Sequence, residues 1–275
     1  MASVANISVI KVDGGNLSNT ADVLAVEEPL EIRLEYGPKA NRISKVISVT
    51  MRTPGADDEL ATGFLYTEGV IQQYTDIERI YKCKPANDNV ICVSLTEQAT
   101  PLVGKLDRNF YTTSSCGVCG KASIDAVRTA CNLPDTFDSF RFPASLLVAL
   151  PDALRKSQDV FQRTGGLHAC ALFDAAGQMV TLREDVGRHN ALDKLIGAAL
   201  QQNIVPLANH VLLLSGRASF ELVQKAIMAG VKVVAAVGAP SSLAAEMAEE
   251  WGMTLIGFLR GDRFNIYSGA ERIVI

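Results

Sequence analysis

The sequence lacks any long apolar run, since no segment reaches the roughly 18 consecutive apolar residues that a membrane-spanning helix requires. Its N-terminus has no basic segment followed by an apolar one, which a secretory signal would have, so we expect a cytoplasmic protein. An excess of charge is also missing, because the formal net charge is only −4. This small charge excludes the broad basic surface of a general nucleic-acid-binding protein.

Metal-ligating patterns are scarce as well. The three histidines are scattered along the chain, and the CxxC pattern occurs once, at Cys116 and Cys119. A structural zinc site usually takes four ligands from a second CxxC or a histidine pair, so no metal is expected.

The chain has six cysteines but no secretory signal, which predicts reduced thiols. Cys92 and Cys170 stand in apolar runs and are expected to be small buried hydrophobic residues, and Cys83 and Cys131 to be structural.

Hydrophobic residues make up 48% of the chain and charged residues 20%, which is typical of a globular protein of one or two domains. Residues 1–110 are predicted to form a smaller N-terminal α+β domain with an antiparallel sheet. Its alternating apolar residues predict strands, and the acidic turn at Asp57 predicts the start of a helix. The expected strands are 7–12, 30–36, 43–50, 77–82 and 90–95.

Residues 135–275 alternate helix-like and strand-like segments. Helices are predicted over 143–150, 152–163, 190–201, 220–229 and 243–251, and strands over 167–173, 178–184, 211–214, 231–237, 254–259 and 264–267. Such alternation predicts an α/β domain in which helices cover both faces of a mixed sheet, an αβα sandwich. Between the domains, residues 111–134 are predicted to form a mobile loop that bears the cysteine pair, followed by a short helix.

The cysteine pair is the first candidate for chemistry. Glycines flank both thiols, and Lys121 with the following helix start would favour the nucleophilic thiolate. Three functions fit such a pair: a thioredoxin-like dithiol, a zinc site and a sulfur-relay cysteine that carries a persulfide. Placement in a loop favours the sulfur relay, because a carrier needs an exposed nucleophile on a mobile segment.

Polar residues also gather where predicted strands meet predicted helices. Open α/β sheets bind ligands at the carboxyl ends of their strands, and helix N-termini there attract phosphates. The candidate ligand residues at these junctions are Asp185, Arg188, His189, Ser215, Gly216, Arg217, Phe258, Leu259, Arg260, Gly261, Asp262 and Arg263. They predict a pocket for an anionic, nucleotide-like ligand, although Asp185 would also serve as an ordinary helix cap.

Several segments together resemble the formate dehydrogenase accessory sulfurtransferase family (FdhD/NarQ). The matching segments are residues 27–30, 62–65, 116–120, 164–168, 184–194, 215–219 and 257–258. The resemblance implies that Cys116 accepts sulfur from a cysteine desulfurase as a persulfide, with Cys119 as its partner. The sulfur would pass to the molybdenum of bis(molybdopterin guanine dinucleotide), a bound substrate, for the catalytic subunit of formate dehydrogenase.

The same resemblance implies a cytidine-deaminase-like fold for the second domain, a homodimer, and cofactor binding by residues 258–263. The segment after Phe258 varies within the family, so side-chain contacts transfer less safely than backbone contacts. Asp185, Arg188 and His189 would contact the ligand or position groups near the sulfur.

Three alternatives remain open at this point. A zinc-dependent deaminase would need H-x-E followed by P-C-x-x-C, whereas here the cysteine pair precedes His168 and residue 170 is Cys. A cofactor chaperone would bind and deliver the cofactor without sulfur transfer. A dithiol redox protein would depend on a disulfide between Cys116 and Cys119.

Overall fold

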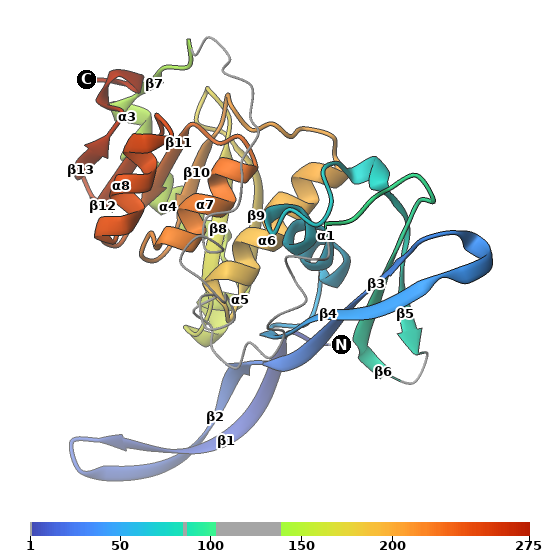
Figure 1. Ribbon diagram of the computed structural model, residues 1–275. Helices are drawn as coiled ribbons and strands as arrows, with labels where there is room; N and C mark the ends of the chain where they lie inside the picture. The colour runs from blue at the N-terminus through green and yellow to red at the C-terminus, as the bar shows by residue number, and fades with distance from the viewer. Residues whose placement is uncertain (1, 85–86, 103–138) are drawn as a thin grey trace.

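The computed structural model describes residues 2–84, 87–102 and 139–275 (Figure 1). It consists of a hairpin arm, a four-stranded sheet and a six-stranded sheet, with helices packed around the larger sheet and between the two.

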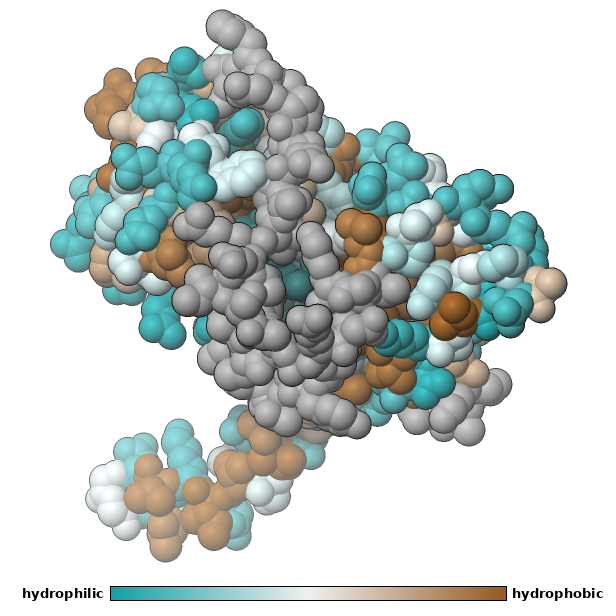
Figure 2. Space-filling view, in the orientation of Figure 1, coloured by the Kyte–Doolittle hydropathy of each residue, from teal (hydrophilic) through white to brown (hydrophobic). Residues whose placement is uncertain are grey.

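The arm is the hairpin of β1 (Val4–Asp13) and β2 (Asn16–Ala25), which projects away from the rest of the molecule (Figure 1). Gly14 and Gly15 turn the chain with φ of 54° and 87°, a region that glycine adopts without steric cost. On one face of its tip, Ile10, Val12 and Leu17 are 68%, 65% and 72% exposed, and Figure 2 shows hydrophobic residues along the arm. Strand β2 was not predicted, because its residues 16–20 are mostly polar and neither face is buried.

The four-stranded sheet has the order β4-β3-β6-β5. Its strands are β3 (Glu28–Tyr36), β4 (Ile43–Arg52), β5 (Ile77–Lys84) and β6 (Asn87–Leu95), with short 3-10 turns at Lys39–Asn41 and Tyr74–Asp76. The prediction of an antiparallel sheet is wrong for its central pair, since β3 and β6 run parallel. A parallel pair needs a long crossover, and the chain between β3 and β6 supplies it through β4, β5 and helix α1 (Asp57–Thr67).

The six-stranded sheet has the order β13-β12-β11-β10-β8-β9. Its strands are β8 (His168–Phe173), β9 (Met179–Asp185), β10 (Val211–Leu214), β11 (Val233–Ala236), β12 (Thr254–Arg260) and β13 (Arg263–Ser268). The central strands β10, β11 and β12 are parallel and the outer pairings are antiparallel, so the predicted mixed sheet is confirmed.

Helices cover both faces of this sheet, which confirms the predicted αβα sandwich (Figure 1). One face packs on α6 (Arg188–Gln201), α7 (Phe220–Met228) and α8 (Ser242–Glu250). The other packs on α3 (Ala144–Leu147) and α4 (Leu150–Ser157), followed in the chain by α5 (Asp159–Thr164). Three short helices thus replace the two predicted over 143–163. A small parallel pair, β7 (Phe142–Pro143) with β14 (Ile273–Val274), and a 3-10 turn at Ala270–Arg272 complete the fold.

The two halves of the chain share one apolar core. Residues of β3, β6 and α1 belong to the same buried cluster as residues of α6, α7 and the large sheet. Helices α1 and α6 cross closely through two glycines: a Cβ on Gly63 would lie 1.8 Å from the carbonyl oxygen of Asp193, and one on Gly197 would lie 1.9 Å from that of Glu59. Only residues without a side chain allow this approach. The first half is therefore packed against the α/β half along a helix pair.

The prediction that all the thiols are reduced is wrong for Cys83 and Cys92, which form a disulfide. The two residues lie on adjacent strands, β5 and β6, near the closed end of their hairpin. Their Cα atoms are 5.5 Å apart, within the range that a disulfide bridges. Cys170 is buried with a free thiol, as predicted. Cys131 lies outside the described residues.

Candidate functional site

The candidate ligand residues lie along one edge of the six-stranded sheet. Strand β10 ends there next to Ser215, and β12 ends there within Phe258–Arg260. Strand β9, which is antiparallel to its neighbour β8, ends there at Asp185. Four strand spacings separate β12 from β9, or about 19 Å at the usual spacing of about 4.8 Å. The edge is thus long enough for an extended ligand rather than a single small group.

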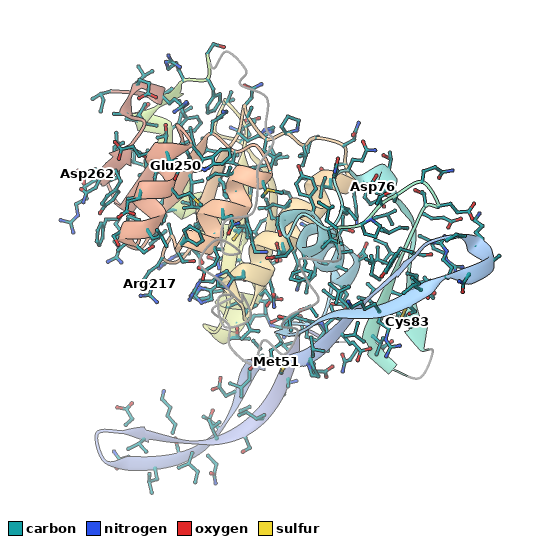
Figure 3. All side chains as sticks on the ribbon, in the orientation of Figure 1. Met51, Asp76, Cys83, Arg217, Glu250 and Asp262 are labelled. Atoms are coloured by element: carbon teal, nitrogen blue, oxygen red, sulfur yellow. A yellow bond between two sulfur atoms is a disulfide. The ribbon has the colours of Figure 1, made fainter. Side chains whose placement is uncertain are left out.

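The middle of this edge is formed by residues 215–219, between β10 and α7. The backbone amide of Gly238 donates to the carbonyl of Gly216 at 2.8 Å, and the Ser215 hydroxyl accepts from the amide of Ala169 at 2.8 Å. These bonds continue the sheet pairing beyond the strand ends and fix the path of the segment. Arg217 is exposed beside it, as Figure 3 shows.

Asp185 is enclosed rather than open to a ligand. Its side chain is fully buried and forms a 2.7 Å ion pair with Lys194. Its oxygens also accept from the backbone amides of Thr53 and Gly187. Because Thr53 belongs to the first half of the chain, Asp185 joins the two halves at the start of α6, and the geometry favours a positioning role.

Arg188 and His189 open helix α6 on the same edge. The Nε atom of Arg188 and the Nε2 atom of His189 are buried and form no hydrogen bond with any residue that the structure describes. Buried polar atoms are normally paired, so these two groups have unused capacity for a polar partner. The Glu221 carboxylate lies near His189, with its Oε2 3.8 Å from the His189 Nε2.

His168, which was not among the predicted site residues, lies at the start of β8 on this edge. A Cβ on Gly216 would lie 3.4 Å from its Nδ1 atom, so the imidazole packs against the Gly216 backbone. Glu221, in the first turn of α7, was also missed. The signal that could have found both is their position, since each stands within a few residues of a strand end at this edge.

The pKa values of His168 and Glu221 are both shifted from their ordinary values. Burial lowers the pKa of His168, and the charges of Arg188 and His189 lower it further, while Asp185 opposes them. Burial alone would raise the pKa of Glu221, but the nearby His189 and the backbone amide of Glu221 itself outweigh it, and the pKa falls to about 2. At neutral pH His168 is therefore neutral and Glu221 is ionised.

The last predicted stretch, residues 258–263, forms the end of β12, a tight turn and the start of β13. Leu259 is fully buried in the core, so its side chain faces no ligand. Phe258 is 42% exposed with a φ of 55°, and Arg260, Asp262 and Arg263 are exposed, Asp262 being labelled in Figure 3. Phe258 is held in this unusual backbone conformation while its amide donates to the carbonyl of Gly238 at 3.0 Å.

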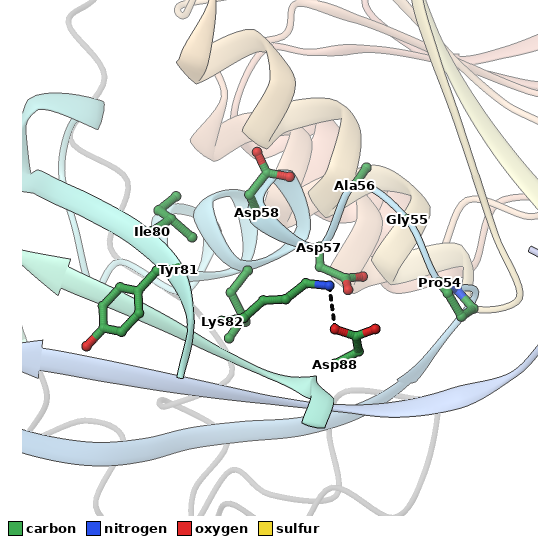
Figure 4. A pocket seen from close by; sticks show the side chains of 10 residues that line it. Pro54, Gly55, Ala56, Asp57, Asp58, Ile80, Tyr81, Lys82 and Asp88 are labelled. Carbon is green, nitrogen blue, oxygen red and sulfur yellow. Dashed lines mark hydrogen bonds and ion pairs between the residues drawn. The ribbon is translucent and has the colours of Figure 1, made fainter. Parts of the chain in front are cut away.

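A cavity of about 450 Å³ lies elsewhere, between the β5–β6 hairpin and the start of α1 (Figure 4). It is lined by Pro54, Gly55, Ala56, Asp57, Asp58, Ile80, Tyr81, Lys82, Asp88 and Ile91. Lys82 and Asp88 pair at 2.6 Å, and Asp57 binds the buried guanidinium of Arg52. Its charged side chains already have partners, since Asp58 also accepts from the Gln201 side chain, and none of the predicted site residues lines the cavity.

The predicted cysteine pair, Cys116 and Cys119, lies in residues 103–138, outside the described part of the chain. Within the described part, no cluster of His, Cys, Asp and Glu could hold a metal ion. No helix formed by the described residues has both the length and the apolar character to cross a membrane.

Comparison with known proteins shows the family. The model of the FdhD/NarQ family matches residues 25–274. Curated relatives named sulfur carrier protein FdhD include one from Streptomyces coelicolor, 52% identical over 97% of this chain and 94% of the relative. Another, from Mycobacterium tuberculosis, is 50% identical over 92% of both chains.

The fold has a counterpart among solved structures. A putative formate dehydrogenase accessory protein from Desulfotalea psychrophila has a similar structure, with a TM-score of 0.77 over 99% of this chain and 100% of that one, at 24% identity. At that identity the likeness concerns the fold alone. The match over residues 25–274 and the half-identical relatives together show that the chain belongs to the FdhD/NarQ family.

Proposed function

We propose that this chain, a sulfur carrier in formate dehydrogenase maturation, carries its sulfur as a persulfide on Cys116, with Cys119 as a partner. The observation that supports the proposal most directly is the near-full-length similarity to sulfur carrier proteins of a chain that contains a single CxxC pair. A thiolate accepts a sulfur atom by attacking a donor persulfide, which a cysteine desulfurase supplies. In this proposal the transfer takes place in the cytoplasm.

The acceptor in this proposal is bis(molybdopterin guanine dinucleotide), bound as a substrate on behalf of the catalytic subunit of formate dehydrogenase. The residues along the edge fit its chemistry. Arg217, Arg260 and Arg263 are exposed there and suit pyrophosphate groups, and the exposed ring of Phe258 suits stacking against a base. Ser215, Gly216, Gly261 and Asp262 would contribute backbone or polar contacts, and Leu259 would contribute only through its backbone.

Arg188 and His189 have distinct roles in this proposal. Their buried nitrogens, which have no hydrogen-bond partner among the described residues, would bind an anionic part of the substrate, at the opposite end of the edge from Phe258. Asp185 would act through its bonds to Lys194, Thr53 and Gly187, which hold the start of α6 in place. A homodimer is part of the proposal, as the family resemblance implies.

The test is to incubate the protein with a cysteine desulfurase and cysteine and to record intact-protein and peptide mass spectra. We expect a gain of one or more sulfur atoms on the peptide that contains Cys116 and Cys119, and loss of that gain in Cys116→Ala. Cys170→Ala is the matched control and should gain sulfur normally, because the Cys170 thiol is buried.

Absence of any gain in the unsubstituted protein, with both thiols free and reactive, would contradict the carrier chemistry. The cofactor-chaperone function would then be the better explanation. An obligatory Cys116–Cys119 disulfide would instead indicate a dithiol redox protein.

A further inference from the structure

The hairpin arm of β1 and β2 packs poorly against the rest of the molecule. The two strands pair along their whole length, from Val4 with Ala25 to Asp13 with Asn16. Both strands lie within the described residues, and every residue in them is exposed or only partly buried. A two-stranded hairpin is at best marginally stable in water unless one of its faces packs against something else. The extended arm in Figure 1 therefore calls for a cover on one face.

The two faces of the arm differ in charge. Cross-strand partners share a face, so the register divides the side chains of the arm into two sets. All three charged residues of the arm, Lys11, Asp13 and Asp22, belong to one set. The other set, which we call the uncharged face, consists of Val4, Asn6, Ser8, Ile10, Val12, Leu17, Asn19, Ala21, Val23 and Ala25. Antiparallel strands that pack on one face alternate in this way.

The uncharged face is open at the tip of the arm. Ile10, Val12 and Leu17 are 68%, 65% and 72% exposed there, whereas Val23 and Ala25, near the base, are partly buried. The base lies beside the body of the molecule, where β2 contacts α5. Figure 2 shows hydrophobic side chains along the part of the arm that extends beyond the body. No element among the described residues covers this tip, so its burial requires a further contact.

The composition of the arm favours a second copy of this chain as the cover. The arm has one lysine, two aspartates, no arginine and no aromatic residue. Binding to nucleic acids or to anionic lipids depends on clusters of lysine and arginine, which the arm lacks. A face without charge is instead complementary to itself, as a two-fold contact between identical surfaces requires.

The size of the arm and the role of the protein support the same partner. The arm spans residues 4–25, which matches the about 20–30 residues that each partner contributes to a stable interface. A sulfur carrier meets its donor and its acceptor in turn, so neither of them can cover the arm throughout the working cycle. An identical copy can remain bound at every stage.

We propose that two copies of this chain pack their arms together, uncharged face against uncharged face, and that this contact is the homodimer interface. The inference rests on the proposed function for the homodimer and assigns its surface. Because both copies use the same face, the contact closes at two chains. The side chains of Ile10, Val12 and Leu17 supply its apolar centre, and the charged face stays in solvent.

The experiment measures the mass of the full-length protein in solution by sedimentation equilibrium over a range of concentrations. The test variant replaces a cross-strand pair at the tip, Val12→Lys with Leu17→Glu. The opposite charges lie across from each other, which preserves the hairpin while it removes the apolar tip. The control variant introduces the same charges at a cross-strand pair of the opposite face, Val9→Lys with Thr20→Glu.

We expect a dimer for the unsubstituted protein and for the control variant. The dissociation constant of the test variant should rise by at least about 100-fold, because four apolar side chains, two from each arm, lose their burial. Hydrogen exchange gives a second measure on the same samples. The amides of the arm should exchange at least about tenfold faster in the test variant than in the dimer, since a lone hairpin is marginally stable. Amides of α6 should exchange at unchanged rates, which shows that the body remains folded.

A monomeric unsubstituted protein would overturn the inference, as would a test variant that dimerises as tightly as the control does. In a monomer, protection of the arm from exchange would show that the same chain covers it. The proposed persulfide chemistry fails separately from this inference, because the absence of sulfur on Cys116 appears in the mass spectra and leaves the dimer unchanged.

Discussion

Charged and polar side chains with buried atoms are of two kinds in this protein: those whose hydrogen bonds are satisfied, and those with unused hydrogen-bonding capacity. Lys225 shows the first kind, since its ammonium group is bonded to Thr67, Glu68 and Asp193 and holds α7 against α1 and α6. The half-buried side chains of Arg188 and His189 show the second kind, because each has a buried nitrogen without a hydrogen-bond partner in the described part of the chain. A buried group whose hydrogen bonds are all satisfied stabilises the fold, whereas a buried group with unused hydrogen-bonding capacity can bind a ligand.

Glu221 carries a prediction for acid stability. Its pKa of about 2 in the folded protein lies below the ordinary value of 4.5, so its ionised form favours folding. This contribution is fully present above about pH 4.5 and is lost as the pH falls through about 2. The full shift would correspond to about 3 kcal/mol, and partial exposure to solvent reduces this to about 1–2 kcal/mol.

The measurement is urea unfolding of the unsubstituted protein and Glu221→Gln between pH 2 and 7. We expect the difference in unfolding free energy between the two proteins to shrink steadily below pH 4.5. A constant difference across this range would show that the Glu221 carboxylate contributes nothing through its ionisation. Glu249→Gln, at an exposed position in the last turn of α8, serves as the control.

The secondary structure elements follow closely from local patterns in the sequence. Strands β3, β4, β8 and β10 were predicted because alternation or continuous apolar runs report burial directly. Local patterns do not report partners, so the parallel pairing of β3 with β6 could not be read from them. The joining of Cys83 to Cys92 was missed for the same reason, since it depends on the register of β5 and β6.

The candidate site was predictable to a similar extent. The junctions after β9, β10 and β12 were recognisable because strand ends collect ligand residues in open α/β sheets. The sequence did not show which of these residues are enclosed and which are available to a ligand. Asp185 is enclosed and His189 is available, yet both are simply polar residues in the sequence. Leu259 was predicted as a ligand residue but lies in the core. Its burial depends on which face of strand β12 its side chain occupies.

The crossing of α1 and α6 yields a prediction at this scale. Gly197→Ala should destabilise the protein by about 1–3 kcal/mol or more, because its Cβ would lie 1.9 Å from the Glu59 carbonyl oxygen. Alanine is otherwise the better helix former by up to about 1 kcal/mol, so any loss reflects the contact between the helices. Thermal unfolding of Gly197→Ala should be compared with that of Gly166→Ala, where the nearest atom would be 3.9 Å away. Equal stability of the two variants would show that the helices separate without cost.

At the scale of the whole molecule, the described halves are joined by more than the chain between them. The sequence predicts domains of residues 1–110 and 135–275, yet the buried cluster includes residues from both. Asp185 and Lys194 add polar bonds from the α/β half to Thr53. Cooperative unfolding follows from such a shared core.

Differential scanning calorimetry should accordingly show a single transition for the two halves. Its calorimetric and van't Hoff enthalpies should agree, as they do for two-state unfolding. Leu192→Ala, at a fully buried position of α6 in the shared cluster, should lower the midpoint of that one transition. Two separate transitions, only one of which responds to Leu192→Ala, would show that the halves unfold independently.

The placement of the cysteines allows the reactive thiols to be distinguished from the unreactive ones by alkylation. Cys83 and Cys92 are tied to each other, and Cys170 is enclosed by apolar residues, where burial raises the pKa of its thiol. Three of the six cysteines therefore do not react with an alkylating reagent in the native state. Any label that a brief exposure attaches belongs to Cys116, Cys119 or Cys131. Because an alkylated persulfide is heavier than an alkylated thiol by one sulfur atom, the mass of the labelled protein follows these thiols through the sulfur cycle without a substitution.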